Sequence, residues 1–300
     1  MPNQTQPPHL PVLVKEVLKY LDPKPGESYL DLTAGYGGHA GLILKATGAP
    51  DKALLVDRDQ QAVEALTRRF EGSKPQIVHS EFLSTLEKLA GESRQFDMIL
   101  ADLGVSSPHL EDSRRGFAFR LSGPLDMRMD TRQEMTAHQI VNHFKEAELA
   151  QMLRTYGEEP KASAIASAIV AHRPISDTAG LAAIISEAVG SVRRRGKIHP
   201  ATKSFQAIRI AVNDELRQIE AGLPLMLEIL SPGGRLAVIS FHSLEDRLVK
   251  QFFSDNSGNR YDARLTLLTK RPITASPDEI ASNPRARSAK LRASRKNKNK

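Results

Sequence analysis

The residues from Asp31 to Ala40 read DLTAGYGGHA and combine a carboxylate with three closely spaced glycines. A short apolar run precedes this stretch, and the apolar residues 42–44 follow it. The order is typical of a strand, a glycine-rich turn and a helix, an arrangement that holds nucleotide-like ligands in several enzyme classes. A P-loop would need a Gly-Lys-Ser/Thr sequence whose lysine reaches the phosphates, and this stretch has none. The turn therefore indicates a nucleotide-like ligand other than a triphosphate held by a P-loop.

Two further acids, Asp57 and Asp102, follow apolar runs and extend the pattern. Asp57 comes 22 residues after Gly35, where an acid binds ribose hydroxyls in dinucleotide enzymes. NAD and S-adenosylmethionine both carry such a ribose, and the G-x-G-G-x-x-G spacing matches the dinucleotide fingerprint imperfectly. A pyrophosphate beside Asp31 would be repelled, whereas a sulfonium and an ammonium would be favoured. The acids therefore favour S-adenosylmethionine and leave a dinucleotide as the alternative.

Alternating strand and helix patterns must position these residues. Strand-like segments at 28–34, 53–59, 76–80 and 96–104 alternate with amphipathic stretches near 38–47, 59–71 and 81–90. Such alternation predicts a parallel, doubly wound α/β sheet, in which ligands bind outside the carboxyl ends of the strands. The glycine turn, Asp57 and Asp102 all fall at such ends. We therefore expect them at one edge of one sheet.

The alternation stops after the fourth strand. Residues 106–205 show helical patterns at 137–144, 147–156, 162–170 and 179–189, and strand signals return at 233–242 and 260–270. In the segment 162–170 we expect Ile165, Ile169 and Val170 to be core residues. The simplest organisation is a Rossmann-like domain made of 1–105 and 206–300, interrupted by a helical insertion at 106–205.

Composition limits the chemistry and the surroundings. The 300 residues include no cysteine, which excludes disulfides, thiolate metal sites, iron–sulfur clusters and cysteine nucleophiles. The net charge is +7, and residues 285–300 hold eight of the 42 basic residues and no acid. This tail predicts contact with a polyanion such as nucleic acid, with residues 295–300 solvated. The absence of a long apolar run or a secretory signal predicts a cytoplasmic protein without membrane contact.

Long motifs give the chain a specific resemblance. The stretches HLPVLVKEVL (9–18), DLTAGYGGHA (31–40), GPLDMRMD (123–130), HPATKSFQAIRIAVNDEL (199–216) and SFHSLEDR (240–247) resemble the bacterial ribosomal RNA small subunit methyltransferase H family, also called MraW. The resemblance covers nearly the whole chain. It implies a class I S-adenosylmethionine-dependent methyltransferase sheet with a helical insertion domain. It further implies methyl transfer from S-adenosyl-L-methionine to N4 of a cytidine in the decoding region of 16S rRNA.

The resemblance also implies site residues. The family usually has Gln where this chain has His109, so a contact from that position would come from an imidazole. We expect Asp102 to orient the cofactor and to act catalytically near the target amine. Ser243 with Asp246 predicts a capping box, and His242 receives no role. The cofactor-binding residues implied are Gly37, Gly38, His39, Asp57, Phe82, Asp102 and His109.

For RNA contact the sequence offers basic clusters at the entry to the insertion and at the return from it. The proposed RNA-binding residues are Arg193, Arg194, Arg195, Lys197 and Lys203. The expected partner is 16S rRNA in the small ribosomal subunit, and both a monomer and a homodimer are compatible with the sequence. A methyltransferase acting on a small molecule or protein and a non-catalytic RNA-binding module are the competing functions. The basic tail disfavours the first of these, and the intact cofactor motifs disfavour the second.

Overall fold

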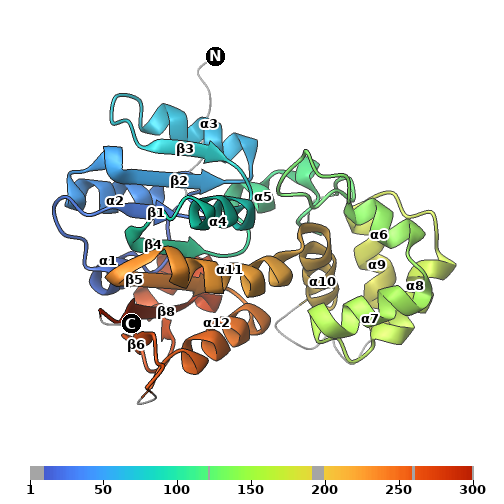
Figure 1. The fold of residues 1–300 in the computed structure, drawn as a ribbon. Coiled ribbons are helices and arrows are strands. Elements are labelled where there is room, and N and C mark those ends of the chain that lie inside the picture. Colours follow the sequence, from blue (N-terminus) through green and yellow to red (C-terminus); the bar gives the residue numbers. More distant parts are fainter. Residues whose placement is uncertain (1–9, 121, 191–198, 259–260, 299–300) are drawn as a thin grey trace. The chain divides into compact units, whose positions relative to one another are not determined.

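The computed structural model of the chain describes residues 10–120, 122–190, 199–258 and 261–298 (Figure 1). The chain divides into a sheet unit, Met1–Gly104 with Leu216–Lys300, and a helical unit, Val105–Glu215. The insertion thus continues ten residues beyond position 205, because helix α10 (Thr202–Asn213) packs on α7 (Glu146–Gly157). The packing is close: a Cβ on Gly157 would lie 2.8 Å from the backbone oxygen of Lys203.

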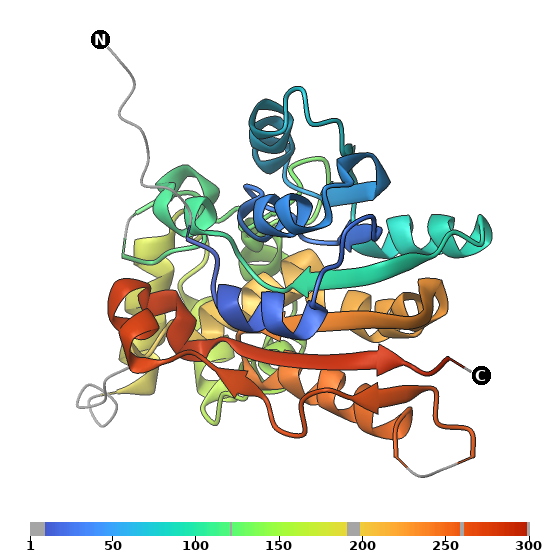
Figure 2. The same cartoon turned by 90° about the vertical axis from the view of Figure 1, so that its left-hand side faces the viewer.

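The sheet unit is built on one mixed sheet with the strand order β3-β2-β1-β4-β5-β8-β6. The first five strands of that order are parallel, and β8 is antiparallel to β5, β6 and β7. This confirms the Rossmann-like α/β fold. Figure 2 shows β4, β5 and β8 running side by side. The strands are β1 (Tyr29–Asp31), β2 (Ala53–Asp57), β3 (Gln76–His79), β4 (Phe96–Asp102), β5 (Leu230–Ser240), β6 (Leu265–Leu267), β7 (Ile273–Thr274) and β8 (Lys290–Lys296).

Helices cover both faces of this sheet because apolar residues occur at successive positions of the parallel strands. Tyr29 and Leu55 belong to the cluster on one face, with α1 (Val14–Leu21), α2 (Gly38–Thr47) and α3 (Gln60–Arg69). Leu30 and Leu54 belong to the other, with α4 (Phe82–Gly91), α11 (Glu215–Ile229) and α12 (Ser243–Asp255). The shorter helices are η1 (Pro50–Lys52), α13 (Pro277–Ser282) and η4 (Pro284–Ser288).

The basic tail is an integral part of the sheet. Strand β8 lies between β5 and β6, and its Arg292 is 8% exposed, with Nε donating to Asp246 Oδ1 at 2.7 Å. Lys296 is 7% exposed and its Nζ donates to the backbone oxygen of Leu230 at 2.6 Å. The prediction of a solvated end from 295 onward is therefore wrong for Lys296. The two positive charges are therefore paired with acceptors inside the sheet unit, because a buried cation needs a hydrogen-bond acceptor.

The helical unit confirms the four helices that periodicity predicts between 137 and 189, and it has further helices at 107–115 and 202–213 that were not predicted. It contains α5 (Ser107–Glu111), η2 (Ser113–Arg115), α6 (Ala137–His143), α7, α8 (Ala162–Ala171), α9 (Thr178–Val189) and α10. Ile165 and Ile169 are fully buried, and Val170 packs against the same cluster, which confirms their core assignment. The described residues of this unit form no β-strand, and their β-type pairing is limited to an isolated bridge between Pro124 and Asp177. Across the described ranges, no helix is long and apolar enough to cross a membrane.

Candidate functional site

The candidate site lies where the strand order reverses. Strands β2 and β4 flank β1, and an open α/β sheet binds ligands outside the carboxyl ends of its strands at such a point. Asp31, Asp57 and Asp102 are the last residues of β1, β2 and β4. The three acids singled out by the sequence therefore occupy the edge at which a ligand is expected.

The glycine turn after β1 is shaped by its neighbours. Gly35 has φ +53°, and its N–H donates to Asp57 Oδ2 at 2.7 Å. Gly37 has φ +77°, and a Cβ there would lie 2.8 Å from the ring of Phe70 in the segment after α3. A side chain at Gly37 would meet both backbone strain and a steric clash. The turn is therefore held in shape by its contacts with the end of β2 and with the residue that follows α3.

Gly38 is held close by the N-terminal segment. A Cβ on Gly38 would lie 2.9 to 3.1 Å from three ring carbons of Pro11. The Pro11 segment is fixed in turn, because the N–H of Leu13 donates to Glu279 Oε1 of α13 at 2.6 Å. A glycine is therefore required at position 38 by packing, which is sufficient to explain it independently of any ligand contact.

Helix α2 begins at this turn with Gly37 as its N-cap, and within the described chain no side chain caps it. The N–H groups of its first turn lie at the positive end of the helix dipole, which favours an anionic group. His39 lies in the same turn and is 7% exposed. Its Nε2 is 3.7 Å from Asp102 Oδ2. The turn thus places a potential anion site next to a carboxyl group.

Asp102 is the most unusual group at this edge. Its backbone N–H donates to Thr33 Oγ1 at 2.6 Å, while its buried Oδ1 has no hydrogen-bond partner among the described residues. The side chain is 18% exposed, so a ligand can approach it. Burial raises the pKa of Asp102 well above its usual range, and the charges of Asp31 and Glu245 raise it further. A cation at this place would favour the ionised carboxylate.

Burial also raises the pKa of Asp31. Its Oδ2 accepts from the Tyr29 hydroxyl at 2.7 Å and its Oδ1 from the N–H of Thr33 at 3.2 Å. Burial nevertheless raises the pKa of Asp31 to about 7, and these two hydrogen bonds limit the rise, while Asp57 adds to it. Two neighbouring buried acids with raised pKa values favour a cationic group beside their carboxyl groups, whereas the first turn of α2 favours an anionic group.

Asp57 and Phe82 both have structural partners. Asp57 accepts the N–H of Gly35 at Oδ2 and that of Asp59 at Oδ1, at 2.7 and 2.8 Å. A carboxylate oxygen has a second lone pair, so a ribose contact is compatible with this role. Phe82, the first residue of α4, is 9% exposed, and its ring would lie 2.9 Å from a Cβ on Gly222 of α11. Its ring is therefore part of the packing between α4 and α11.

The turn between β5 and α12 differs from expectation. The sequence predicts a cap from Ser243 and Asp246, but the N-cap is His242 and its reciprocal partner is Glu245. His242 has the extended backbone of an N-cap residue, so the helix starts one residue earlier than the serine would allow. Glu245 is fully buried and its Oε2 accepts the N–H of Phe241 at 2.7 Å. Sequence reasoning missed Glu245; a search for any polar residue three positions before Glu would have found it.

His109 belongs to the helical unit. Its Nδ1 accepts the N–H of Ser106 at 3.3 Å, as the third residue of a capping box at α5. A Gln at this position would make the same reciprocal bond, so the imidazole preserves the cap. Its ring also lies 5.0 Å from that of Phe117. The departure from Gln therefore has a local structural explanation.

The expected RNA-binding residues fall into two groups. Arg193, Arg194, Arg195 and Lys197 lie outside the described residues. Lys203 is described, and its Nζ donates to the backbone oxygen of Glu158 at 2.9 Å, just past the end of α7. Lys203 therefore helps to complete a helix terminus, where a cation is favourable.

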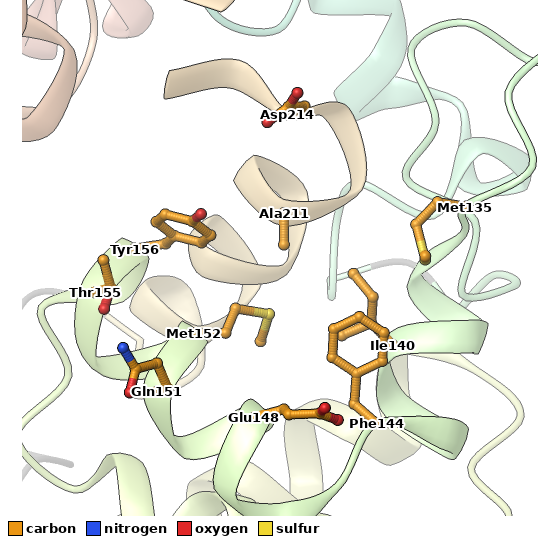
Figure 3. Close-up of a pocket in the computed structure, with 10 residues that line it drawn as sticks. All are labelled: Met135, Ile140, Phe144, Glu148, Gln151, Met152, Thr155, Tyr156, Ala211 and Asp214. Carbon is orange, nitrogen blue, oxygen red and sulfur yellow. The ribbon is translucent and has the colours of Figure 1, made fainter. Parts of the chain in front are cut away.

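The helical unit also has a cavity of about 390 Å³ between α6, α7 and α10 (Figure 3). Its lining combines apolar side chains such as Ile140 and Met152 with the carboxyl groups of Glu148 and Asp214. Two carboxyl groups disfavour a phosphate and suit a neutral or cationic group. The full lining is Met135, Ile140, Phe144, Glu148, Gln151, Met152, Thr155, Tyr156, Ala211 and Asp214.

Comparison with known proteins identifies a family whose sequence model matches this chain. Residues 6–297 match the sequence model of the MraW methylase family. A protein called Ribosomal RNA small subunit methyltransferase H from a Nostoc species is 48% identical to this chain, and the match covers 96% of this chain and 92% of that protein. A protein of the same name from a Cyanothece species is 49% identical, and the match covers 97% of this chain and 96% of that protein. A solved rRNA methylase from Streptococcus thermophilus is 10% identical, with a TM-score of 0.42 and 99% of each chain covered.

Proposed function

The chain belongs to the MraW methylase family, and we propose that it transfers a methyl group from S-adenosyl-L-methionine to the exocyclic N4 amine of a cytidine in the decoding region of 16S rRNA. The relatives named above are ribosomal RNA small subunit methyltransferases, which supports an rRNA substrate. The methyl donor, the atom methylated and the region of the RNA are part of the proposal.

The observation that carries the proposal is the state of Asp102. It ends β4 at the switch point of the sheet, with a buried oxygen that lacks a hydrogen-bond partner within the described chain and a raised pKa. Such a carboxyl group favours a cationic neighbour. S-adenosylmethionine carries a sulfonium and an ammonium, whereas a dinucleotide carries a negatively charged pyrophosphate.

The residues at this edge fit the remaining groups of that cofactor. The uncapped first turn of α2, with Gly38 and His39, suits its carboxylate, and Asp57 suits its ribose hydroxyls. Phe82 and His109 stay proposed contacts from the family resemblance. When bound, the cofactor supplies an electrophilic methyl group whose departure leaves neutral sulfur.

Asp102 would then accept a proton from the target amine. The lone pair of an exocyclic cytosine amine is delocalised into the ring, so its attack needs an acceptor for the N–H proton. Asp102 Oδ1 is buried and has no hydrogen-bond partner within the described chain, and the side chain as a whole is 18% exposed, so the carboxyl group can be reached. A chain without cysteine cannot methylate C5 of cytosine through a thiolate adduct. These features favour transfer to nitrogen.

We assign RNA recognition to the helical unit and in particular to its basic residues Arg193, Arg194, Arg195, Lys197 and Lys203. The small ribosomal subunit is the proposed partner, and the proposed location is therefore the cytoplasm, where subunits are assembled. No membrane partner is part of the proposal.

The test is methyl transfer from labelled S-adenosylmethionine to 30S subunits, naked 16S rRNA and free cytidine, followed by mass spectrometry of the nucleosides. We expect N4-methylcytidine from the decoding region and none from free cytidine. Label at another atom, on protein or nowhere would overturn the proposal.

A matched pair of variants tests the role of Asp102. Asp102→Asn should lower kcat by about 10²–10⁴-fold, the usual contribution of a general base. Asp97→Asn lies at the other end of β4, where Asp97 accepts from the N–H of Ser28, and should leave the rate nearly unchanged. Equal rates in the two variants would remove Asp102 from the mechanism.

A further inference from the structure

Strand β8 carries the cations of the C-terminal tail from one edge of the sheet to the other (Figure 2). Lys290, its first residue, is paired with Ser240, the last residue of β5. Arg295, near its end, is paired with Arg235 of β5, which is in turn paired with Met98 near the start of β4. The candidate site lies at the edge where the parallel strands end, so it shares that edge with Lys290.

The register of the strands places Lys290 close to Asp102. Asp102 is paired with Ile239 of β5, and Ile239 is paired with Leu291 of β8. Because neighbouring strands lie about 4.8 Å apart, the backbones of Asp102 and Leu291 are separated by about 10 Å. Lys290 is the residue before Leu291, and its side chain is 36% exposed. A surface cation therefore lies two strands away from the proposed proton acceptor.

The ion pairs around Lys290 leave a net positive charge. Lys290 Nζ is 3.5 Å from Asp246 Oδ2, and Arg292 Nε is 2.7 Å from Oδ1 of the same carboxylate. One carboxylate is thus shared by two cations. Arg292 is buried, whereas Lys290 reaches the surface, so the excess positive charge is accessible to an anionic ligand at Lys290.

A second cation, Arg287, lies three residues before Lys290 in η4 and is exposed. No hydrogen bond or ion pair to another described residue holds its guanidinium group. The helix η4 is fixed beside the glycine turn, because its N-cap residue Asn283 donates from Nδ2 to the backbone oxygen of Leu10 at 3.1 Å. The next residue in the chain, Pro11, packs on Gly38. A guanidinium group in this position suits a phosphate, which it can bind through two parallel hydrogen bonds.

A substrate RNA would need such cations at this edge. A base that is methylated on its exocyclic amine leaves the stack and enters the site, so the phosphates on either side of it stay at the rim. Carboxylates accept hydrogen bonds and repel phosphates, so the acids of the site cannot hold this backbone. Cations beside the site can hold it, and they release counterions when they do so.

We propose that Arg287 and Lys290 form a phosphate-binding surface on the sheet unit, which holds the backbone of the substrate RNA next to the target nucleotide. This rests on the proposed function and adds a contact on the sheet unit to those assigned to the helical unit. The tail thus has two kinds of cation: Arg292 and Lys296 complete the sheet, and Arg287 and Lys290 bind RNA. Phosphates carry no sequence information, so this surface positions the RNA and leaves the choice of base to other contacts.

The test compares two double variants that remove the same charge from the same tail. Arg287→Ala with Lys290→Ala removes two cations at the edge of the site. Arg295→Ala with Lys298→Ala removes two exposed cations at the other edge, where the side chain of Lys298 lies beside Gly233. In filter binding of 16S rRNA, the first should lower the affinity and reduce the slope of log affinity against log salt by about 1–2, because each phosphate contact accounts for about 0.7–0.9. The second should leave both nearly unchanged.

Further measurements separate RNA binding from folding and from cofactor binding. Thermal unfolding and the affinity for S-adenosylmethionine, measured by calorimetry, should be close to wild type in the first double variant, because Asp246 keeps Arg292 as its partner. The KM for 30S subunits should rise. Exchanging the two residues, Arg287→Lys with Lys290→Arg, keeps both charges and should restore the salt slope.

Two results would overturn the inference: an unchanged rRNA affinity in the first double variant, or equal losses of affinity and slope in both double variants. Equal losses would mean that the net charge of the protein, and no particular surface, attracts the RNA. If rRNA affinity falls as expected but no N4-methylcytidine is formed by the wild-type protein, the proposed function fails while the phosphate-binding surface stands.

Discussion

At the scale of residues, three aspartates at one sheet edge have three different states. Asp57 accepts two backbone N–H groups, Asp31 accepts from a buried tyrosine hydroxyl, and Asp102 has an oxygen with no hydrogen-bond partner in the described chain. Their positions at strand ends are alike, so the difference comes from the donors and charges around them. The neighbours of each aspartate decide whether it supports the loop or is available for chemistry.

The raised pKa of Asp31 predicts a pH dependence of stability. Between the ordinary aspartate value of 3.8 and about 7, the folded protein holds a proton that the unfolded chain has released. Stability from this group is therefore present at low pH and is lost as pH rises towards 7, by at most about 4 kcal/mol. In Asp31→Asn this loss should disappear.

The measurement is urea unfolding of both proteins between about pH 5 and about pH 8. Asp112, Asp126 and Asp246 have lowered pKa values, so their contributions change only below 3.8 and do not interfere in this window. Asp31 also raises the pKa of Asp102, so the variant should reduce both effects in the same direction. Parallel stability curves for the two proteins would show that Asp31 is not the source.

At the scale of elements, the glycine turn depends on a segment far away in the chain. Gly38→Ala places a methyl group 2.9 to 3.1 Å from Pro11 and should cost about 1–3 kcal/mol of stability through overpacking. Pro11→Ala removes two of the three ring carbons concerned and should recover part of that loss. A double-mutant cycle, measured by chemical unfolding, should give a favourable coupling energy. Simply additive losses would mean that Gly38 is required for another reason.

Strand β8 gives a second prediction at this scale. Arg292→Ala removes two hydrogen bonds to Asp246 from a residue that is 8% exposed, and should destabilise the sheet unit by about 2 kcal/mol. Arg287→Ala removes the same charge from an exposed position in the same tail and should cost little. Thermal unfolding of both variants checks this. If both lost RNA affinity equally with no change in stability, the tail would be acting as a nucleic-acid arm.

At the scale of the whole molecule, the sheet unit is discontinuous. Strands β1 to β4 precede the helical unit, while β5 and β8 follow it; β5 pairs with β4, and β8 pairs with β5. The sheet can therefore be completed only after the whole insertion has been made. Placing an insertion directly after β4 attaches the helical unit to the strand that ends in Asp102.

The RNA affinity of the full chain should depend on Arg193, Arg194 and Arg195. Replacing all three by alanine should reduce the slope of log affinity against log salt by about 2–3, because each phosphate contact releases counterions. Replacing all three by lysine should keep most of the slope. Filter binding of 16S rRNA over a range of salt concentrations measures both. An unchanged slope in the alanine variant would place the RNA contacts elsewhere.

The sequence by itself determined the features that depend on local pattern. Hydrophobic periodicity and turn residues predicted the strands that end at Asp31, Asp57 and Asp102, the doubly wound sheet, and four helices of the insertion, α6 to α9, because neighbouring residues in the chain carry these signals. The shared edge of the three acids follows from the parallel topology.

Only the tertiary structure decided what these residues do, because the deciding contacts join distant parts of the chain. The N–H of Leu13 meets a carboxylate 266 residues away, and this anchors the segment that requires glycine at 38. The C-terminal tail has the basic composition of a nucleic-acid-binding arm, yet it forms strand β8 because β5 pairs with it. The raised pKa of Asp102 arises from burial and from two acids on other elements, and burial is a property of the folded molecule alone.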